Sequence, residues 1–409
     1  MVLRRYFMQN SERSIIRELA KKYVALANSE EQQRSHRRMK DSNDLKTVRP
    51  PVLIDEIPWH ELTSDPELVC LCEDPLARRT EWFFRRSLYQ KKHFRCDLLM
   101  PNYWKVRMAY EISPLGVEKQ VARSVSGSKS FLDVLEDEAA LEQIREPSFL
   151  AHPELDERNM NFFTDLFHDI MPVRLVGSNC MYMQFWDDIS ELRGVEPIYE
   201  DMYDRPEYLH RIMEKLVRRA SARMDFLEKH FHVDNDPISL HCTPGMISGL
   251  AEDGLKATWY RGMAQPFSCV SPAMFKEFEF DYIKPLAERC AYTYYGCCEP
   301  LDTRIEILKG IRNLRKLGVS PWANEEVCAE QLGSAYVFAR KPNPANVAHR
   351  TDPEVIRKET ENTVKLCLKY GCHPEFVLKD ITTVSKKPEN LTVWANTVSD
   401  VLDRYYETD

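Results

Sequence analysis

The sequence predicts an α/β protein, a (β/α)8 barrel of the TIM type preceded by an N-terminal helical extension. From about residue 50, short apolar runs alternate with long amphipathic helical patterns, as in repeated βα units around a parallel sheet. Several of these runs end in polar motifs, where a barrel places its chemistry. At 409 residues the chain fits one barrel with an extension. We therefore expect a helical arm and charged linker over residues 1–48 and a barrel over 49–409.

Composition excludes several classes of function. The net charge is -8, and no Lys/Arg block offers the basic stripe of a nucleic-acid binder. No apolar run approaches the roughly 18 to 20 residues of a membrane span, and the first ten residues lack an apolar signal core. The twelve cysteines are dispersed. We expect a cytoplasmic protein with mostly reduced thiols, binding neither nucleic acid nor membrane.

The N-terminal arm begins with a predicted helix over residues 11–28, with Ser11 as a plausible N-cap. Its apolar face comprises Ile15, Ile16, Leu19, Tyr23 and Leu26. Residues 29–46 are charged and nearly devoid of large apolar side chains, and Pro50 and Pro51 forbid continuation of a helix. We expect a linker there.

The barrel strands are expected to be short and rich in β-forming residues. We predict them near 97–101, 173–177, 238–242, 292–298, 316–321, 336–339 and 375–378. Between them, Pro206 opens a helix with one apolar stripe, formed by Leu209, Ile212, Met213, Leu216, Ala220, Met224 and Leu227. Further outer helices are predicted at about 273–290, 301–314, 324–332, 352–369 and 391–405.

The sharpest local motif is Tyr295-Gly296-Cys297-Cys298-Glu299-Pro300, at the end of a predicted strand. Thiolate and carboxylate both suit zinc, so Cys297, Cys298 and Glu299 are candidate metal ligands. In a strand Cys297 and Glu299 project to one side and Cys298 to the other, so one thiol would be a ligand and the other packing. The alternative is a buried Cys-Cys pair with Glu299 bonded to neighbouring backbone.

Two further strand ends carry candidate catalytic groups. Asp380 follows the last predicted strand and could ligate a metal, orient a ligand or take a proton. It could equally cap a helix or pair with Lys379. His241, beside Cys242, could ligate, shuttle protons or satisfy a hydrogen bond in the core. With Glu299, these residues form the predicted catalytic set.

The predicted substrate pocket combines two cations with several aromatic side chains. Arg340 and Lys341 would bring positive charge to the barrel mouth for a carboxylate or phosphate, unless they cap a helix or pair with acids. Aromatic residues in the same loops suit an apolar aromatic ligand, although core packing explains many such residues. The candidates are Tyr103, Trp104, Tyr182, Trp186 and Trp322.

Some common catalytic motifs are missing. The sequence contains no phosphate-binding glycine-rich loop, no His-Glu-x-x-His and no Gly-x-Ser-x-Gly. Their absence disfavours nucleotide-driven chemistry and the common hydrolases.

Over about residues 95–405, the order and content of these motifs resemble the uroporphyrinogen decarboxylase superfamily. The resemblance rests on pattern. It is carried by Leu192-Arg193-Gly194, by Asp204-Arg205-Pro206-Glu207 opening a helix, by residues 271–275 opening another, by residues 294–300, and by residues 386–391. The resemblance implies a barrel with its site at the strand ends.

Two branches of that superfamily differ in their sites. The decarboxylases carry an N-terminal Arg-rich segment ending in Gly-Arg, which Arg78-Arg79 and Arg85-Arg86 do not match. The corrinoid-linked methyltransferases carry His-x-Cys where this chain has Tyr295-Gly296-Cys297 or Gly296-Cys297-Cys298, and a later Cys near Asp380. The family's zinc set is therefore only partly retained, and a mixed set of Cys, Glu299 and Asp380 is the expected replacement.

This departure favours the methyltransferase branch, as a demethylating enzyme. The resemblance implies transfer of a methyl group from a methylated, possibly methoxy-aromatic, small substrate to a corrinoid carried by a partner protein, with zinc as metal. A homo-oligomer is compatible with the sequence. Two rivals stay open: a decarboxylase of a porphyrinogen-like polycarboxylate, and a non-catalytic corrinoid-handling barrel.

Overall fold

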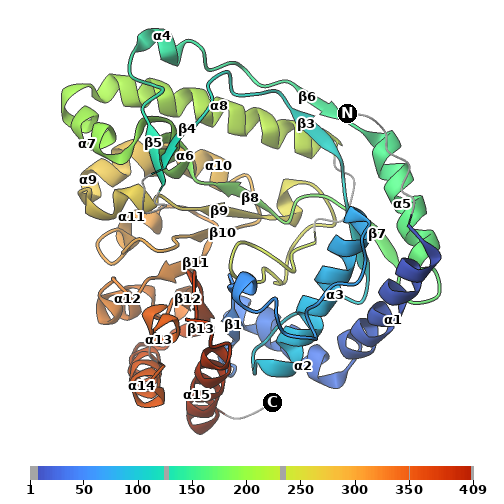
Figure 1. Cartoon of the computed structure of the whole chain (residues 1–409). Helices are drawn as coiled ribbons and strands as arrows, with labels where there is room; N and C mark the ends of the chain where they lie inside the picture. The colour runs from blue at the N-terminus through green and yellow to red at the C-terminus, as the bar shows by residue number, and fades with distance from the viewer. Residues whose placement is uncertain (1–7, 124–128, 231–235, 350, 407–409) are drawn as a thin grey trace.

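The computed structural model describes residues 8–123, 129–230, 236–349 and 351–406. Its centre is a curled parallel sheet of seven strands with the order β1-β13-β12-β11-β10-β9-β8. These strands are β1 (Val52–Ile54), β13 (His373–Leu378), β12 (Val337–Arg340), β11 (Leu314–Val319), β10 (Tyr292–Tyr295), β9 (Trp259–Gly262) and β8 (Cys180–Met183). The sheet forms a half-barrel (Figure 1).

Three two-stranded sheets flank this half-barrel. The strands β2 (Trp104–Arg107) and β7 (Val173–Val176) pair in parallel. Two antiparallel pairs lie beyond them, β3 (Tyr110–Ile112) with β6 (Phe149–Ala151) and β4 (Gln120–Arg123) with β5 (Lys129–Leu132). The chain is thus a mixed α/β protein, as predicted, and its main sheet is open between β8 and β1.

Helices surround the convex side of the sheet, and an N-terminal group lies across from its open side (Figure 1). The N-terminal group contains α1 (Asn10–Ala27), α2 (Glu30–Asn43), α3 (Pro75–His93) and α5 (Pro153–Phe167). The remaining helices are α4 (Glu138–Leu141), α6 (Phe185–Arg193), α7 (Val195–Asp204), α8 (Pro206–His230), α9 (Pro272–Phe275), α10 (Asp281–Ala287), α11 (Ile305–Leu308), α12 (Glu325–Leu332), α13 (Ala345–Ala348), α14 (Pro353–Tyr370) and α15 (Glu389–Tyr405).

Most predicted helices are confirmed. The predicted apolar stripe of α8 is buried along its whole length, because residues three and four apart share one helix face. The predicted helix at 273–290 is interrupted by a π-turn over Lys276–Phe280. Within 301–314 only α11 is α-helical. Among the described residues, no helix is both long enough and apolar enough to cross a membrane.

The linker expected over residues 29–46 is wrong, because most of that segment is helix α2. The Ser29 side chain caps the helix by accepting a hydrogen bond from Gln32 N. The buried face of α2 is largely polar and bonds to backbone: the Gln32 amide donates to Leu98 O and accepts from Met100 N. Asn43 Nδ2 donates to Met246 O at 2.9 Å.

The cap of α1 also differs from expectation, since Gln9 rather than Ser11 is its N-cap.

Two predicted strands are also wrong, 97–101 and 238–242. In the first, Asp97 Oδ2 accepts from Val52 N and Gln32 Oε1 accepts from Met100 N, so side chains replace a neighbouring strand. In the second, Leu240 N donates to Thr243 O and Cys242 has a φ of 73°, so the chain turns. The predictions at 173–177, 292–298, 316–321, 336–339 and 375–378 coincide with β7, β10, β11, β12 and β13.

Candidate functional site

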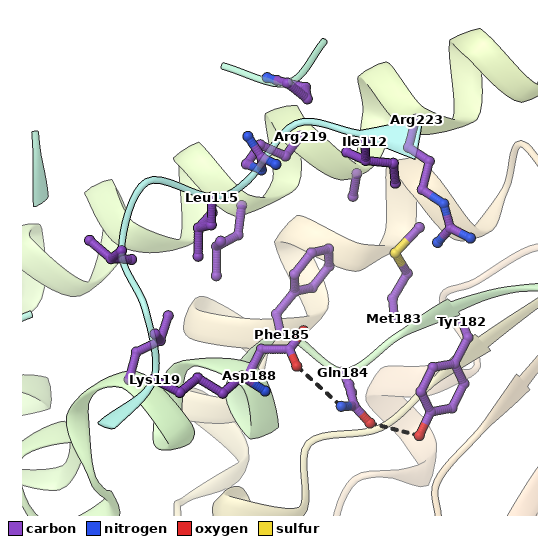
Figure 2. A pocket seen from close by; sticks show the side chains of 15 residues that line it. Ile112, Leu115, Lys119, Tyr182, Met183, Gln184, Phe185, Asp188, Arg219 and Arg223 are labelled. Carbon is purple, nitrogen blue, oxygen red and sulfur yellow. Dashed lines mark hydrogen bonds between the residues drawn. The ribbon is translucent and has the colours of Figure 1, made fainter. Parts of the chain in front are cut away.

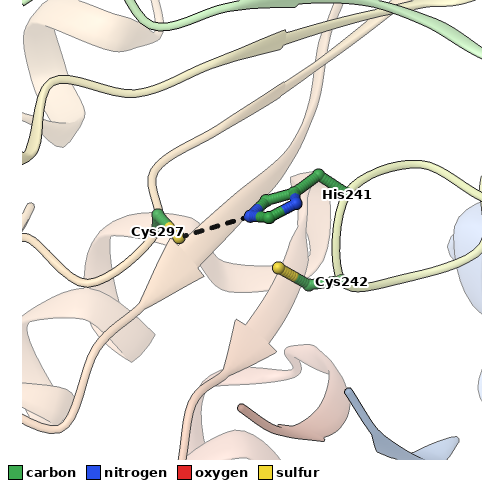
Figure 3. Close-up of side chains that lie close together, drawn as sticks. All are labelled: His241, Cys242 and Cys297. Atoms are coloured by element: carbon green, nitrogen blue, oxygen red, sulfur yellow. Dashed lines mark hydrogen bonds between the residues drawn. The ribbon is translucent and has the colours of Figure 1, made fainter. Parts of the chain in front are cut away.

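Three side chains that could hold a metal ion meet beside the end of β10: His241, Cys242 and Cys297 (Figure 3). One imidazole nitrogen and the two sulfurs all lie within 4.8 Å of one another. His241 Nε2 lies 4.0 Å from Cys297 Sγ. Cys242 and Cys297 are buried and His241 is partly exposed, so an ion held there would keep access to solvent on one side.

The first two residues of this His-Cys-Cys site belong to a turn that enters the open side of the half-barrel. Gly245 N donates to Pro237 O, which closes the base of the turn. The turn is fixed to α2 by Asn43 and to β13 by Thr243, whose hydroxyl donates to Glu375 Oε2 at 3.0 Å. Because Cys242 takes a left-handed conformation, its side chain and that of His241 both face Cys297.

The third residue, Cys297, follows β10 through a tight glycine turn. Gly296 has a φ of +93°, and a Cβ there would lie 2.3 Å from Leu301 Cδ1. The neighbouring Gly318 allows a similarly close approach, because its Cβ would lie 2.7 Å from Gly296 O. The buried Glu299 carboxylate then accepts hydrogen bonds from Cys297 N at 2.9 Å and Ala264 N at 3.2 Å. These contacts fix the backbone that carries the Cys297 sulfur.

A strong positive charge lies against the Cys297 sulfur. Lys379 Nζ is 2.7 Å from Cys297 Sγ and 3.5 Å from Cys298 Sγ. Burial alone would lower the pKa of Lys379, but the nearby Cys242 and Cys297 sulfurs raise it above its ordinary value. Hydrogen bonds from Cys242 and Cys298 and the charge of Arg261 hold the pKa of Cys297 well below its ordinary range. Both pKa shifts favour a thiolate at Cys297 paired with an ammonium group at Lys379.

The other two thiols behave differently from Cys297. Hydrogen bonding to Cys297 raises the pKa of both Cys242 and Cys298, with burial adding to the effect. Cys298 donates its S–H to Asp380 Oδ2 at 2.9 Å. The Cys297 and Cys298 sulfurs are 3.7 Å apart and both are free thiols. The site thus combines one anionic sulfur with two protonated ones.

Beneath this site the interior of the half-barrel is unusually polar. Lys316 and Glu375 form a fully buried ion pair at 2.7 Å, and the Lys316 ammonium also donates to Thr243. The Arg261 guanidinium stacks over the Tyr294 ring at 3.9 Å. Lys341 Nζ lies 5.4 Å from the same ring and has no hydrogen-bond partner among the described residues. Inward cations therefore outnumber inward carboxylates.

The structure separates the predicted metal ligands into different roles. Cys297 is part of the His-Cys-Cys site, but both Glu299 oxygens are engaged by backbone N–H groups. Asp380 is at the rim, where it pairs with Lys379 at 3.0 Å and receives the Cys298 thiol. Its own N–H donates to Glu56 Oε2 at 2.8 Å. His241, predicted as a catalytic residue, lies inside the site.

The predicted substrate-binding residues are dispersed. Arg340 is buried and pairs with Glu359 at 3.1 Å, while Lys341 faces the half-barrel interior. Trp186 is fully buried and donates to Phe278 O. Trp322 is 68% exposed. Of the aromatic candidates, Tyr182 packs against the His-Cys-Cys site: its ring centroid lies 5.1 Å from that of His241.

Tyr103 and Trp104 line a cleft of about 710 Å³ beside the open edge of the sheet. Its walls include Trp59, Phe83 and the two guanidinium groups Arg86 and Arg107. A smaller cavity of about 180 Å³ shares Ile54, Asp55 and Ser239 with this cleft and extends to Cys242. The smaller cavity therefore adjoins the cleft and reaches one residue of the His-Cys-Cys site, Cys242.

Sequence reasoning missed two important residues. Cys242 was noted beside His241 but was not counted as a ligand, although adjacent His and Cys are a usable signal for a metal site. Lys379 was considered only as a partner for Asp380. Asp187, in the first turn of α6, accepts a hydrogen bond from Gln265 N at 3.1 Å, and burial raises its pKa to about 7.

No family model matches the chain, and no curated protein matches it. The site must therefore be interpreted from its own chemistry.

Proposed function

We propose that this protein is a zinc-dependent methyltransferase, which transfers a methyl group from a small methylated substrate to a cobalt corrinoid on a separate protein. The observation that carries this proposal is the convergence of His241, Cys242 and Cys297 within 4.8 Å of one another beside the C-terminal end of β10. The motif resemblance to the uroporphyrinogen decarboxylase superfamily gives the reaction class. A set of donors suited to a metal, His241, Cys242 and Cys297, favours the methyltransferase branch of that superfamily over the decarboxylases.

The donor set fits zinc. Zinc prefers thiolate and imidazole ligands, and a catalytic zinc site keeps three protein ligands and one open position. With ordinary zinc bond lengths, tetrahedral ligand atoms lie about 3.5 to 3.8 Å apart. The three donors, all within 4.8 Å of one another, would need to approach by about 1.3 Å at most. The depressed pKa of Cys297 supplies the thiolate that zinc requires.

The reaction needs help with its leaving group. When the C–O bond of a methyl ether breaks, the oxygen keeps the electron pair and becomes a poorly stabilised alkoxide or phenoxide. Bound zinc would supply Lewis-acid stabilisation of that oxygen. Asp187, with a pKa of about 7, is partly protonated at neutral pH and is suited to deliver a proton. In this proposal His241 is a ligand, not the proton carrier expected from the sequence.

The cleft suits the proposed substrate. Its aromatic walls, including Trp59, Phe83 and Trp104, would hold a methoxylated ring, and the smaller cavity that adjoins it is lined by Cys242. The corrinoid protein would have to approach the same strand ends, so its docking surface surrounds the cleft in this proposal. We also propose that the fold is an opened (β/α)8 barrel, with the β2–β7 pair beside the gap. The parallel order of the other seven strands supports that interpretation.

Metal analysis tests the site directly. We expect about one zinc per chain in the purified protein, and its loss in His241→Ala, Cys242→Ser and Cys297→Ser. Cys298→Ser and Asp380→Asn should keep the metal, and Cys269→Ser, at an exposed cysteine, is the matched control. Metal loss in Cys298→Ser and Asp380→Asn, with retention in His241→Ala and Cys242→Ser, would instead support the ligand set expected from the sequence.

Activity requires a separate assay. The zinc-loaded protein is incubated with a reduced corrinoid protein and a panel of O-, N- and S-methylated compounds, and cobalt methylation is followed by visible absorbance. We expect a substrate-dependent change that His241→Ala abolishes. A zinc-binding protein that is inactive across the panel would contradict the methyltransferase proposal and favour a non-catalytic corrinoid-handling barrel if it still binds the corrinoid protein.

A decarboxylase of a porphyrinogen-like polycarboxylate is the second candidate. It is favoured by Arg86 and Arg107, which line the cleft and have no carboxylate partner among the described residues. Such a reaction would need no zinc. Release of CO₂ from a porphyrinogen by Cys297→Ser protein, and its loss in Arg86→Gln, would establish this function in place of the first.

A further inference from the structure

A second pocket lies on the other side of β8 from the cleft, and neither the proposed metal nor the proposed methyl transfer uses it. It has a volume of about 400 Å³ and lies between α8 and α6 (Figure 2). The segment from Ile112 to Lys119 covers it. We call it the α8 pocket. None of its lining residues lines the cleft, so the two are separate.

The walls of the α8 pocket are mainly apolar. They include Leu216 and Ala220 of α8, Met183 of β8 and Phe185 of α6, and Ile112 lies on the covering segment. At about 400 Å³, the pocket lies near the lower end of the range of small-molecule sites, roughly 300 to 1,000 Å³. Its size and apolar walls therefore suit a small, largely apolar molecule.

Two guanidinium groups give this apolar pocket a charged end. Arg223 Nε donates to Tyr110 Oη at 3.1 Å, and its two terminal nitrogens have no partner among the described residues. Arg219 donates only to backbone carbonyls, those of Arg145 and Ser113. Neither has a carboxylate within ion-pair distance in the described part of the chain. A partly buried cation without a counter-ion favours an anionic ligand.

The opposite wall of the α8 pocket leads to the His-Cys-Cys site. Tyr182 lines the pocket, and its ring lies 5.1 Å from that of His241. Its hydroxyl donates to Gln184 Oε1 at 2.7 Å, and Gln184 Nε2 donates to Asp188 Oδ1 at 3.1 Å (Figure 2). A molecule bound in the pocket would contact Tyr182 and would thereby change the surroundings of the His241 ring.

We propose that the α8 pocket binds a small amphipathic carboxylate, with its carboxylate on Arg223 and its apolar body against Leu216, Met183 and Phe185. The planar fork of Arg223 matches a carboxylate, and the unpaired terminal nitrogens offer the two parallel N–H groups that bidentate binding needs. Decanoate, with a dozen non-hydrogen atoms, has the right size. This inference does not depend on the proposed methyl transfer, because the pocket is separate from the cleft.

Isothermal titration of the full-length protein tests the proposal with decanoate and decanol, each below its aggregation limit. We expect decanoate to bind wild-type protein at least about tenfold more tightly than decanol, because a charge-assisted hydrogen bond is lost with the alcohol. Arg223→Gln should weaken decanoate by about tenfold and leave decanol unchanged. Arg218→Gln, on the exposed face of the same helix, is the matched control and should bind like wild type.

A second measurement separates binding in this pocket from binding elsewhere. Ala220→Leu places extra volume in the pocket wall, and it should abolish binding of both ligands while the thermal unfolding curve stays cooperative. Decanoate should also change the ¹H–¹⁵N signals of the His241 ring in wild-type protein. Equal binding of acid and alcohol, an equal loss in Arg218→Gln and Arg223→Gln, or unchanged binding in folded Ala220→Leu would each overturn the proposal.

Discussion

Lys379 Nζ lies 2.7 Å from Cys297 Sγ, so the most reactive sulfur of the site is paired with a buried ammonium group. The two residues are 82 positions apart in the chain, so the fold brings them together. The ion pair stabilises the thiolate before any metal binds. A positively charged neighbour is a general way to make a cysteine nucleophilic at neutral pH.

The first prediction concerns this pair. Lys379→Met removes the positive charge beside Cys297, so the pKa of the thiol should rise and its alkylation by iodoacetamide at pH 7 should slow by about tenfold. The measurement is made on metal-free protein, with mass spectrometry to assign the alkylated cysteine. Lys365→Met, at an exposed position of α14, is the control. An unchanged rate in Lys379→Met would show that the thiolate depends on its thiol neighbours alone.

The second prediction concerns the ion pair Lys316–Glu375, which is fully buried. Lys316→Met leaves the Glu375 carboxylate without a counter-ion, and should lower the free energy of unfolding by about 3 to 5 kcal/mol. The double variant Lys316→Met/Glu375→Leu removes both charges and should recover at least half of that loss. Urea unfolding measures all three proteins. A double variant as unstable as the single one would contradict the electrostatic explanation.

The third prediction concerns Asp187, whose pKa burial raises from 3.8 to about 7. Between these two values the folded protein holds a proton that the unfolded chain has lost, so the contribution of Asp187 to stability falls as the pH rises. Asp187→Asn stays neutral throughout. Relative to wild type, it should therefore gain about 2 kcal/mol between pH 4 and pH 8, below the full linkage value because the group is partly exposed.

Unfolding by urea at several pH values measures this difference. Asp225→Asn, at an exposed carboxylate that pairs with Arg289, is the comparison, and its stability should follow the wild-type pH dependence. Parallel pH profiles for Asp187→Asn and wild type would mean that Asp187 stays ionised in the folded protein.

How much of this structure the sequence could predict depends on the kind of contact that forms each element. The apolar stripe of α8 and the short β-rich runs of β10 to β13 are local patterns, and both were predicted. Helix α2 was missed because Gln32, Ser35 and Asn43 are buried by hydrogen bonds to distant segments. Such bonds leave no apolar periodicity in the sequence. The three-residue strand β1 is too short to show alternation.

The candidate site was predicted only in part, because non-local contacts also decide which of its residues meet. In a strand, His241 and Cys242 would project to opposite sides, so a strand prediction hides their shared role. The left-handed conformation of Cys242 turns both toward Cys297. Contacts of the turn with distant residues, including Asn43 and Glu375, hold that conformation. Positions of polar motifs at strand ends were predictable, but which of them meet was not.

The fourth prediction concerns α2. Met39 is fully buried in a cluster with Leu53, Cys242 and Val377. Met39→Ala should lower the free energy of unfolding by about 2 to 5 kcal/mol, because it leaves a cavity in the core. It should also weaken metal binding, since Cys242 packs on the same side chain. Arg37→Ala, on the exposed face of α2, is the control and should change neither the free energy of unfolding nor the metal affinity. An equally small effect of Met39→Ala would mean that α2 contributes little to the core.

The last prediction concerns the glycine turn before Cys297. Gly296 and Gly254 both have a positive φ, but a Cβ at Gly296 would lie 2.3 Å from Leu301 Cδ1, whereas a Cβ at Gly254 would have no neighbour within 4 Å. Gly254→Ala therefore measures the backbone strain alone, about 1 to 2 kcal/mol. Gly296→Ala adds a steric clash and should cost at least about 3 kcal/mol in urea unfolding.

The same two variants should also differ in their affinity for the metal. Because Leu301 is itself buried, relief of the clash in Gly296→Ala should displace the turn as well as the Leu301 side chain, and the Cys297 amide would then lose its hydrogen bond to Glu299. We expect metal affinity to fall about tenfold in Gly296→Ala, measured by competition with a chromophoric chelator, and to stay at the wild-type value in Gly254→Ala. If both variants lose stability equally and keep the metal, the close packing of Gly296 against Leu301 does not position Cys297.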